Sequence, residues 1–255
     1  MIDPVQVTAI IREVAEEVIL PRFGHLAEGD VRQKKPGDFV TIADTEAERL
    51  LTERLSALLP GSLVVGEEAV AADPTVLDRL SGTDPVWILD PIDGTTNFTQ
   101  GNKLFAVIVA LVVEGRTVQG WIHDPVENRT IWAIRGEGCW CDSQRLRITA
   151  EPPLAEMTGS AGWRRQDKLR RRVANLVRQG SAAHDYLGLV DGRLHFALYR
   201  RLRPWDHAAG VLLVEEAGGC AALTDGSPYR PVYTEETILL TAGKRSWDEV
   251  VGLLG

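Results

Sequence analysis

Two aspartates stand three residues apart where an apolar segment ends. The segment Trp87–Leu89 runs directly into Asp90 and Asp93, with Pro91 between them and Gly94 after them. Proline fixes the backbone so that both carboxylates can converge, and glycine permits a tight turn and a close approach of a ligand. Hard oxygen ligands of this kind favour Mg²⁺ or Mn²⁺ over zinc. The alternative is an ordinary surface turn, which the same residue types form.

A helical turn is expected immediately after this pair of aspartates. Thr95 and Thr96 can open such a turn, and its free backbone N–H groups favour a phosphate. An anion site beside carboxylates is chemically reasonable only if a cation lies between them. The segment therefore predicts a phosphate that is bound through a divalent cation.

Two more carboxylate motifs occur in the chain. Glu67 and Glu68 follow the short apolar segment Val64–Gly66, and Asp206 begins an apolar segment that we expect to be helical. Taken singly, the paired glutamates fit an exposed charged pair after a strand. Asp206 alone fits a helix N-cap, a position at which aspartate is favoured. Each motif proves little by itself.

The spacing of apolar residues predicts the elements that position these side chains. Helices are expected over about Val5–Leu20, Asp44–Leu58, Gln166–Arg178 and Asp206–Ala217, and from Ser246 onward. Strands are expected over Leu63–Val65, Val86–Leu89, Phe105–Val113, Val118–Ile122, Thr130–Ile134 and Leu146–Ile148. The helix over 44–58 is expected to start with a capping box formed by Thr45 and Glu48.

The order of these elements suggests two halves in one compact unit. Residues 1–150 are expected to form an α+β half, with helices layered on a mostly antiparallel sheet. Residues 151–255 are expected to form an α/β half. Pro152 and Pro153 mark the best candidate seam between the halves.

Composition narrows the class of partner and the compartment. The 255 residues carry a formal net charge of −8, which gives no general attraction to nucleic acid. Residues 1–26 alternate apolar and charged side chains at helical spacing, so we expect an amphipathic helix and neither a signal peptide nor a membrane span. Cys139, Cys141 and Cys220 are an odd and sparse set that favours a reducing compartment, and the cytoplasm is the expected location.

Three acidic motifs in this order resemble those of the inositol monophosphatase family, Mg²⁺-dependent and Li⁺-sensitive phosphatases of small sugar phosphates. The motifs are 66–68, Trp87–Phe98 and Trp205–Gly210, and weaker similarity extends over about residues 34–219. The resemblance implies a layered αβαβα sandwich with the metal site between its two halves. It also implies a small phosphorylated metabolite as substrate, and a homodimer.

The resemblance further implies a role for each matching residue. Two or three Mg²⁺ ions, or Mn²⁺ as a substitute, would be held by Glu67, Asp90, the backbone carbonyl of Ile92, Asp93 and Asp206, with Asp44 near the most loosely held ion. Glu67 and Thr95 would orient and deprotonate the attacking water. Substrate contacts would come from Asp93, Gly94, Thr95, Gly180, Ser181, Ala182, Tyr199 and Asp206.

The chain departs from the family pattern where the inositol ring is bound. The family holds the ring partly with a Gly-[Ser/Thr]-Ala stretch, present as 180–182, and partly with a glutamate whose position is Tyr199 in this chain. A phenol cannot replace a carboxylate as a charged acceptor for two ring hydroxyls. His184 stands where an aliphatic residue is common, and the arginines within 200–203 could favour a second anionic group or belong to a solvated basic loop.

Inositol monophosphate is the expected substrate, and other functions stay open. Histidinol phosphate would need an acidic or aromatic cradle, which Tyr199 and Asp185 could provide in part. Fructose bisphosphate and a 3′-phosphoadenosine nucleotide are further candidates, although the chain lacks the extra length expected for them. A regulatory binding protein on the same fold is an alternative from another class, but every expected metal ligand is present. A metal-dependent nuclease fits poorly with the acidic net charge.

Overall fold

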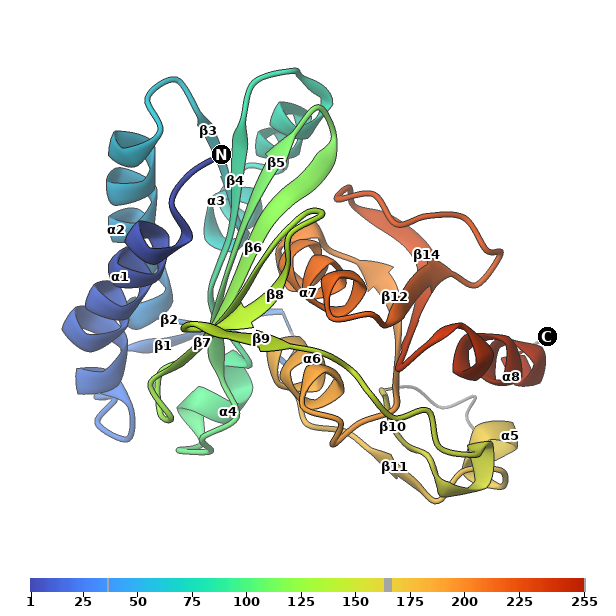
Figure 1. The fold of residues 1–255 in the computed structure, drawn as a ribbon. Coiled ribbons are helices and arrows are strands. Elements are labelled where there is room, and N and C mark those ends of the chain that lie inside the picture. The colour runs from blue at the N-terminus through green and yellow to red at the C-terminus, as the bar shows by residue number, and fades with distance from the viewer. Residues whose placement is uncertain (36, 163–166, 255) are drawn as a thin grey trace.

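Helices and sheets alternate in five layers, in the order helix, sheet, helix, sheet, helix (Figure 1). The computed structural model describes residues 1–35, 37–162 and 167–254 of the chain. The layering is the αβαβα sandwich expected for the sequence, and this prediction is confirmed. Within the described residues, no helix is both long and apolar enough to cross a membrane.

The elements that build these layers are as follows. The helices are α1 (Pro4–Val14), α2 (Ile42–Leu58), α3 (Glu67–Ala72), α4 (Thr95–Thr99), α5 (Asp167–Arg170), α6 (Ala182–Val190), α7 (Pro204–Glu216) and α8 (Lys244–Leu254). The strands are β1 (Val31–Lys35), β2 (Asp38–Thr41), β3 (Leu63–Gly66), β4 (Val86–Asp93), β5 (Ala106–Val113), β6 (Arg116–Asp124), β7 (Arg129–Ile134), β8 (Gly138–Cys141), β9 (Gln144–Leu146), β10 (Thr158–Ala161), β11 (Asn175–Val177), β12 (Phe196–Leu202), β13 (Cys220–Leu223) and β14 (Thr234–Thr241).

The first sheet has seven strands in the order β3-β4-β5-β6-β7-β8-β9. Only the β3–β4 pair is parallel, and the other pairs are antiparallel. Helices α1 and α2 cover one face, and α6 and α7 cover the other (Figure 1). Strands β4 and β5 are buried along almost their whole length. This explains why their sequences are continuous apolar runs and do not alternate.

The second sheet has five strands in the order β11-β10-β12-β14-β13, with α8 on its outer face. Helix α7 lies between the two sheets and contacts strands of both. Its approach to the first sheet is close, because a Cβ atom on Gly120 of β6 would lie 2.9 Å from the Cα of Ala209. On its other side, a Cβ on Gly210 would lie 2.2 Å from the ring of Tyr186 on α6. Helix α7 is therefore held tightly in one position.

The start of α2 differs from the prediction. Thr41 is the N-cap, and its side chain and that of Asp44 form a reciprocal capping box. The predicted capping box of Thr45 and Glu48 is wrong, because both residues lie inside the helix. The two pairs have the same spacing, and their carboxylates differ in the partner they bind. Asp44 accepts from the amide of Thr41, whereas Glu48 accepts from two backbone N–H groups in the first turn of α3.

The segment expected to form a helix over Gln166–Arg178 is mostly not helical. Within the described residues, α5 covers only 167–170, and 175–177 form β11, an edge strand parallel to β10; Gln166 lies outside the described residues. Likewise, the strand expected over 146–148 lies instead at 144–146. Both segments are short edge elements whose conformation is set by pairing with a neighbouring strand, which periodicity along the chain does not reveal.

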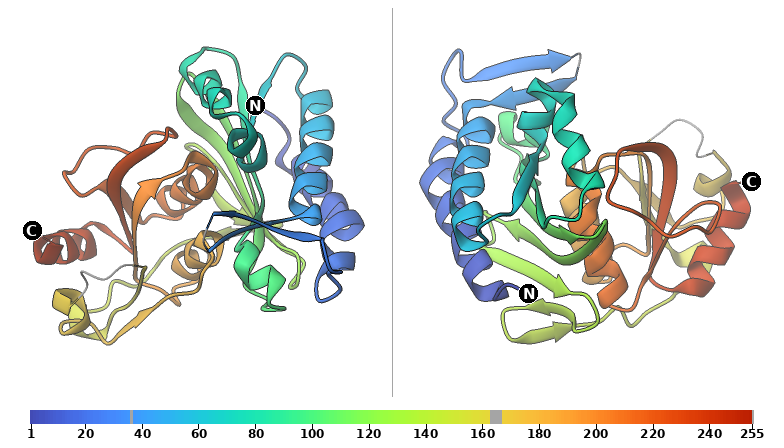
Figure 2. Two further views of the ribbon diagram at one scale, coloured as in Figure 1. Left: turned by 180° about the vertical axis from the view of Figure 1, so that it is seen from behind. Right: turned by 90° about the horizontal axis from the view of Figure 1, so that it is seen from above.

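The hairpin β1–β2 extends from the layer of α1 and α2 toward α6 and the second sheet (Figure 2). Its residues Gly37 and Phe39 line the same small cavity as the carboxyl end of β4. The hairpin therefore brings residues of the N-terminal region to the junction between the two sheets.

Candidate active site

A β-bulge at the end of β4 turns Asp90 and Asp93 to the same side. On a regular strand, side chains three residues apart point to opposite faces. Here Asp90 pairs with Ile108 and Asp93 with Ala106 on β5, so β4 contains one extra residue between the two pairs. A bulge of this kind redirects the side chains that follow it. It contains Pro91, which lacks the N–H group that a regular ladder would use.

Asp206 joins these two aspartates from the other half of the chain. It lies in the first turn of α7, after the N-cap residue Arg203, so Asp206 itself is not the N-cap. One carboxylate oxygen from each of Asp90, Asp93 and Asp206 lies within 4.8 Å of the other two. Asp90 and Asp93 are buried, and Asp206 is partly exposed. The structure thus brings together three of the residues singled out in the sequence.

Glu67 lies next to this group, at the start of α3. The strand before it, β3, runs parallel to β4, and the two strands end side by side. The Nζ atom of Lys34 on β1 donates to Glu67 Oε1 at 3.0 Å and to Glu68 Oε1 at 2.9 Å. Burial lowers the pKa of Lys34, but the two carboxylates outweigh it and hold the pKa above its ordinary value. The ammonium group of Lys34 therefore stays charged at this edge of the site.

Thr95 and Asp44 form a polar pair at the other edge. Thr95 Oγ1 lies 3.3 Å from Asp44 Oδ1 and 3.0 Å from the carbonyl oxygen of Ile92, so its hydroxyl can donate to either. Asp44 Oδ2 accepts from the amide of Thr41 at 2.8 Å and from its hydroxyl at 2.6 Å. Burial raises the pKa of Asp44 to about 7, although these bonds oppose the shift.

A glycine in the left-handed region turns the chain from β4 into α4. Gly94 has φ = 89°, and a Cβ atom there would lie 2.8 Å from the carbonyl oxygen of Leu104, so only glycine fits. The amide group of Asn97 in α4 donates to the carbonyls of Leu104 at 2.7 Å and Gln179 at 2.9 Å. These bonds fasten the turn to the loop that precedes α6.

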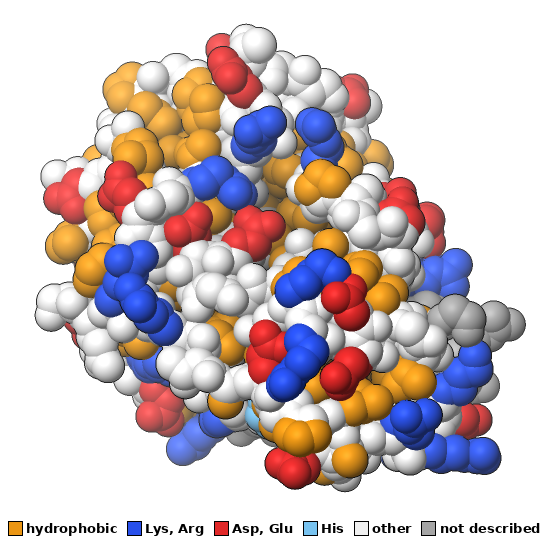
Figure 3. Space-filling model, turned by 45° about the vertical axis from the view of Figure 1, so that its right-hand side comes forward, with side chains coloured by type: hydrophobic (Ala, Val, Ile, Leu, Met, Phe, Trp, Pro, Cys, Tyr) orange, Lys and Arg blue, Asp and Glu red, His pale blue; other side chains and the backbone are white. Residues whose placement is uncertain are grey.

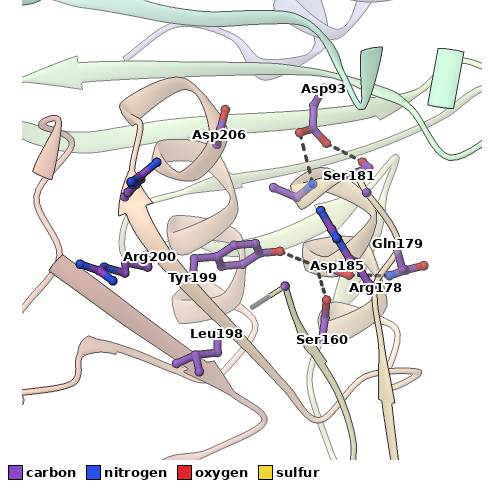
Figure 4. Close-up of a pocket in the computed structure, with 14 residues that line it drawn as sticks. Asp93, Ser160, Arg178, Gln179, Ser181, Asp185, Leu198, Tyr199, Arg200 and Asp206 are labelled. Carbon is purple, nitrogen blue, oxygen red and sulfur yellow. Dashed lines mark hydrogen bonds between the residues drawn. The ribbon is translucent and has the colours of Figure 1, made fainter. Parts of the chain in front are cut away.

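Asp93 makes a second link between the halves (Figure 4). Its Oδ2 accepts from the hydroxyl of Ser181 and from the amide of Ala183 at 2.8 Å, and its Oδ1 accepts from the amide of Ala182 at 3.2 Å. The stretch 180–182, expected to contact substrate, therefore lies directly beside Asp93.

The carboxylates of this cluster disfavour one another's ionisation. Burial is the largest cause that raises the pKa of Asp90 well above its usual range, and the charges of Glu67, Asp93 and Asp206 add to it. Burial also raises the pKa of Asp93, against the hydrogen bonds donated to it. Anions this close together need a counter-cation if all are to be ionised, and oxygen donors match a hard divalent ion. The donor set therefore fits a metal ion.

A cavity of about 480 Å³ opens beside the carboxylate cluster (Figure 4). Asp93 and Asp206 lie on one side of it, residues 178–182 on another, and residues 198–201 on a third. Tyr199, which stands at the position of the family glutamate, is part of this lining.

Asp185 lies in the same cavity wall, and its carboxylate accepts hydrogen bonds from three side chains. Its Oδ2 accepts from Ser160 Oγ at 2.6 Å and from the Tyr199 hydroxyl at 2.5 Å, and its Oδ1 accepts from Gln179 Nε2 at 2.7 Å. Tyr199 and Asp185 thus bond to each other and do not present two separate polar groups to a ligand. His184, the other departure from the family pattern, is buried, with its Nε2 atom 3.2 Å from the carbonyl oxygen of Phe105.

Comparison with known proteins identifies the family. The model of the inositol monophosphatase family matches residues 2–252, and the chain belongs to this family. It is 34% identical to a fructose-1,6-bisphosphatase/inositol-1-monophosphatase of Thermotoga maritima, over 79% of this chain and 80% of the relative. It is also 34% identical to the Nus factor SuhB of Escherichia coli, over 78% of each chain. Among solved structures, a Thermotoga maritima inositol monophosphatase superposes with a TM-score of 0.83 at 29% identity, covering 97% of this chain and 94% of the other.

Membership of this family makes the protein a phosphoric monoester hydrolase that acts on a small phosphorylated substrate. The family depends on metal ions, and the cluster of Asp90, Asp93 and Asp206 could bind one. These findings confirm the class of enzyme predicted from the three acidic motifs.

Several residues of the site were not singled out as site residues from the sequence. Lys34 lies in a short basic stretch, and Asn97 lies inside the motif Trp87–Phe98 but was given no role. Ser160, Gln179 and Arg178 come from a region whose secondary structure is short and irregular, and only the folded chain brings them to the cavity. The run of charge around Lys34 and the amide group at Asn97 were the signals available, and neither is specific.

Proposed function

We propose that this protein hydrolyses a small phosphate monoester in a reaction that depends on Mg²⁺, for which Mn²⁺ can substitute. The observation that carries the proposal is the convergence of Asp90, Asp93 and Asp206 within 4.8 Å, beside the turn at Gly94. Inositol monophosphate is the first substrate to test, because the family and a relative with 34% identity bear that name.

The metal ligands in this proposal are carboxylate and carbonyl oxygens. Two or three divalent ions would be held by Glu67, Asp90, the carbonyl of Ile92, Asp93 and Asp206, with Asp44 near the most loosely held ion. Lys34 engages Oε1 of Glu67, so that Oε2 remains for a metal ion. When bound, such ions neutralise the charge of the phosphate and lower the pKa of water.

Glu67 and Thr95 would position and deprotonate the attacking water. The Thr95 hydroxyl can accept a hydrogen bond from water while it donates its own proton toward Asp44 Oδ1, 3.3 Å away. Bound cations would favour the ionised form of Asp44, in which its carboxylate can accept this hydrogen bond. No covalent phospho-enzyme is needed, because this arrangement delivers water directly to the phosphate.

The substrate would lie across the junction between the two halves. The backbone N–H groups of Gly94 and Thr95 would hold the phosphate, next to Asp93. The leaving group would then extend into the neighbouring cavity, where Gly180, Ser181, Ala182, Tyr199 and Asp206 are the expected contacts.

The test is phosphate release from a panel of phosphate monoesters, with Mg²⁺ and with EDTA. The panel contains both enantiomers of inositol 1-phosphate, histidinol phosphate, fructose 1,6-bisphosphate and 3′-phosphoadenosine 5′-phosphate. We expect release that requires Mg²⁺ and is lost in Asp90→Asn. Mg²⁺-independent release, or release retained by Asp90→Asn, would reject the assigned site.

A regulatory role is the second candidate, because a relative at 34% identity is named a Nus factor. Such a role would depend on the surface of the protein and not on its carboxylate cluster. A loss-of-function phenotype rescued by the Asp90→Asn variant would support it, whereas failure of rescue would support catalysis.

We also propose that the protein is a cytoplasmic homodimer that binds neither nucleic acid nor membranes. The acidic net charge of −8 supports the absence of nucleic-acid binding. On the face shown in Figure 3, basic and acidic side chains are interspersed and form no continuous basic surface. Light scattering of the purified protein would establish its oligomeric state, and a monomer would reject that part of the proposal.

A further inference from the structure

We propose that the cavity beside the carboxylate cluster selects phosphate monoesters that carry a second anionic group, either a carboxylate or another phosphate, over neutral polyol phosphates. This inference rests on the proposed function, because it concerns the leaving group of the same reaction. Three features of the cavity support it. One carboxylate in its wall already accepts hydrogen bonds within the protein, arginines line it, and the resulting balance of charge favours an anion.

The cavity offers few free acceptors to the hydroxyl groups of a polyol. The carboxylates that line it, among the described residues, are Asp93, Asp185 and Asp206. Asp93 and Asp206 belong to the metal cluster. Asp185 accepts three hydrogen bonds, and the Tyr199 hydroxyl that could have faced a ligand donates one of them. A polyol would therefore find few carboxylate acceptors for its hydroxyl groups in this cavity.

Arginine side chains supply donors in place of these acceptors. Arg178, Arg200 and Arg201 all line the cavity. Figure 4 shows the Arg178 side chain beside Ser181 and Asp185, on the side of the cavity that faces the ring of Tyr199. Arg178 makes no hydrogen bond or ion pair to another residue of the described ranges. Its guanidinium is thus available to a ligand, and guanidinium groups bind carboxylate and phosphate with paired hydrogen bonds.

An irregularity in β12 brings two adjacent arginines to one cavity. Neighbouring side chains on a regular strand point to opposite faces. In β12 the pairing with β14 shifts between Arg200 and Leu202, and Arg201 has a positive φ of 66°. Arg201 also contacts Glu235, with Nε 3.2 Å from a carboxylate oxygen. We therefore rest the inference chiefly on Arg178, with Arg200 in support.

The charge balance of the loaded site favours an anion in this cavity. Divalent ions at the cluster would offset Asp93 and Asp206. Besides the enclosed carboxylate of Asp185, the charge that faces the leaving group is then chiefly the guanidinium of Arg178. A leaving group with its own negative charge would be attracted, and a neutral one would not.

The test compares substrates that share a phosphate and differ in the second group. Glucose 6-phosphate is the neutral member, 6-phosphogluconate adds a carboxylate, and glucose 1,6-bisphosphate adds a phosphate. We expect kcat/KM to be about tenfold higher or more for a member with the second charge, since a charged hydrogen-bonded contact is worth about one factor of ten or more. A comparison of 6-phosphogluconate with glucose 1,6-bisphosphate shows whether the cavity prefers a carboxylate or a phosphate as the second group.

Arg178→Gln tests the origin of this selectivity, and Arg230→Gln is the matched control. Arg230 is an exposed arginine that does not line this cavity. We expect Arg178→Gln to lower kcat/KM about tenfold for the doubly charged substrate and about twofold or less for glucose 6-phosphate. Arg230→Gln should change neither value. The combination of Arg178→Gln with Arg200→Gln should remove the remaining preference.

The outcomes separate this inference from the proposed function. Mg²⁺-dependent release without preference for the second charge, or an equal loss on all substrates in Arg178→Gln, would overturn the inference and leave the phosphatase intact. If no compound is hydrolysed, the affinities of the same compounds are measured by calorimetry with Ca²⁺ in place of Mg²⁺. Tighter binding of the charged members that is lost in Arg178→Gln would then support the inference, and equal binding would overturn it.

Discussion

Two groups of buried aspartates lie side by side in this protein, and their surroundings are opposite. Asp90 is surrounded by other carboxylates, which together with burial raise its pKa well above the usual range. Asp185 is equally buried but accepts hydrogen bonds from Ser160, Gln179 and Tyr199. Around Asp90 the neighbouring charges named here are carboxylates, whereas the Asp185 carboxylate is stabilised by hydrogen bonds from three side chains of the protein.

This difference indicates where the chain departs from its family without losing chemistry. The residues around Asp90 match the family motifs, and the group around Asp185 contains Tyr199, at the position expected for the family glutamate. Under the proposed function, Asp90 serves hydrolysis and Asp185 with Tyr199 shapes the cavity for the leaving group, while Asp93 and Asp206 border both. Substitutions in the two groups should therefore have different effects.

The largest effect should come from Asp90→Asn. Removal of this carboxylate should lower kcat at least about 100-fold, since the loss of residues that merely support metal ligands costs about 10- to 100-fold. Steady-state kinetics across a range of Mg²⁺ concentrations would measure the effect. Asp78→Asn, at an exposed position outside the site, is the control and should retain wild-type activity. Recovery of full activity of Asp90→Asn at saturating Mg²⁺ would contradict the role assigned to Asp90.

Thr95→Ala should have the next largest effect, because the hydroxyl acts on the nucleophile. We expect kcat to fall about 100-fold with a smaller change in KM, in the range typical of lost proton-transfer catalysis. Thr95→Ser keeps a hydroxyl and should restore most of the rate. A rise in KM with unchanged kcat would show that Thr95 only binds substrate.

Substitution of the two aspartates should shift stability in opposite directions in EDTA. Asp185→Asn removes an acceptor from three donors and should lower the free energy of unfolding by about 1–3 kcal/mol. Asp90→Asn removes a repelled carboxylate and should leave the free energy of unfolding unchanged or raise it. Denaturant unfolding of both variants would measure this. If both variants were destabilised equally, the comparison between the two groups would fail.

The smallest effect is a dependence of stability on pH. Burial raises the pKa of Asp44 and of Glu48 to about 7, so the folded state holds protons that the unfolded state has released. These two carboxyl groups should therefore lower the free energy of unfolding in EDTA by about 1 kcal/mol as the pH rises from 6.5 to 7.5. Burial lowers the pKa of His123 to about 4 and that of His207 to about 3, so both are neutral in the folded protein, whereas the unfolded chain releases their protons around the ordinary histidine pKa of about 6.5. The two histidines therefore oppose this fall and offset about half of it over the same range.

Two comparisons test whether these carboxyl groups cause the pH dependence of stability. Saturating Mg²⁺ should weaken the pH dependence, because bound cations favour the ionised carboxylates. Asp44→Asn should remove part of the dependence. Stability in EDTA that is constant or rises over this pH range would show that these carboxylates are already ionised in the folded protein.

The layered fold and the enzyme class could be predicted from the resemblance to the family, and the motif that carries most of it is local. The run Trp87–Phe98 combines a buried strand, two carboxylates and a turn in twelve consecutive positions, and the structure keeps that sequence of features in β4 and α4. Helix α2 was predicted from its apolar face. Its first residue was misplaced, because Thr41 with Asp44 and Thr45 with Glu48 have the same spacing. Only the folded chain shows that Glu48 binds the start of α3 instead of capping its own helix.

The cavity could not be predicted in the same way. Its lining comes from short segments near 160, 178–182 and 198–201, which meet only through pairing of β10, β11 and β12. The replacement at Tyr199 was visible in the sequence, but its hydrogen bond to Asp185 was not. Lys34 was missed for a related reason: its contact with Glu67 requires the hairpin β1–β2 to reach the end of β3.

The narrow spacing around α7 has a consequence for how such an enzyme can change over time. Asp206 is carried by this helix, whose position is set by contact with Gly120 on one side and with Tyr186 on the other. A larger side chain at position 120 would displace the helix by tenths of an ångström, and Asp206 would move with it. Affinity for the cation can therefore drift through substitutions far from every ligand, while the catalytic motifs themselves stay unaltered.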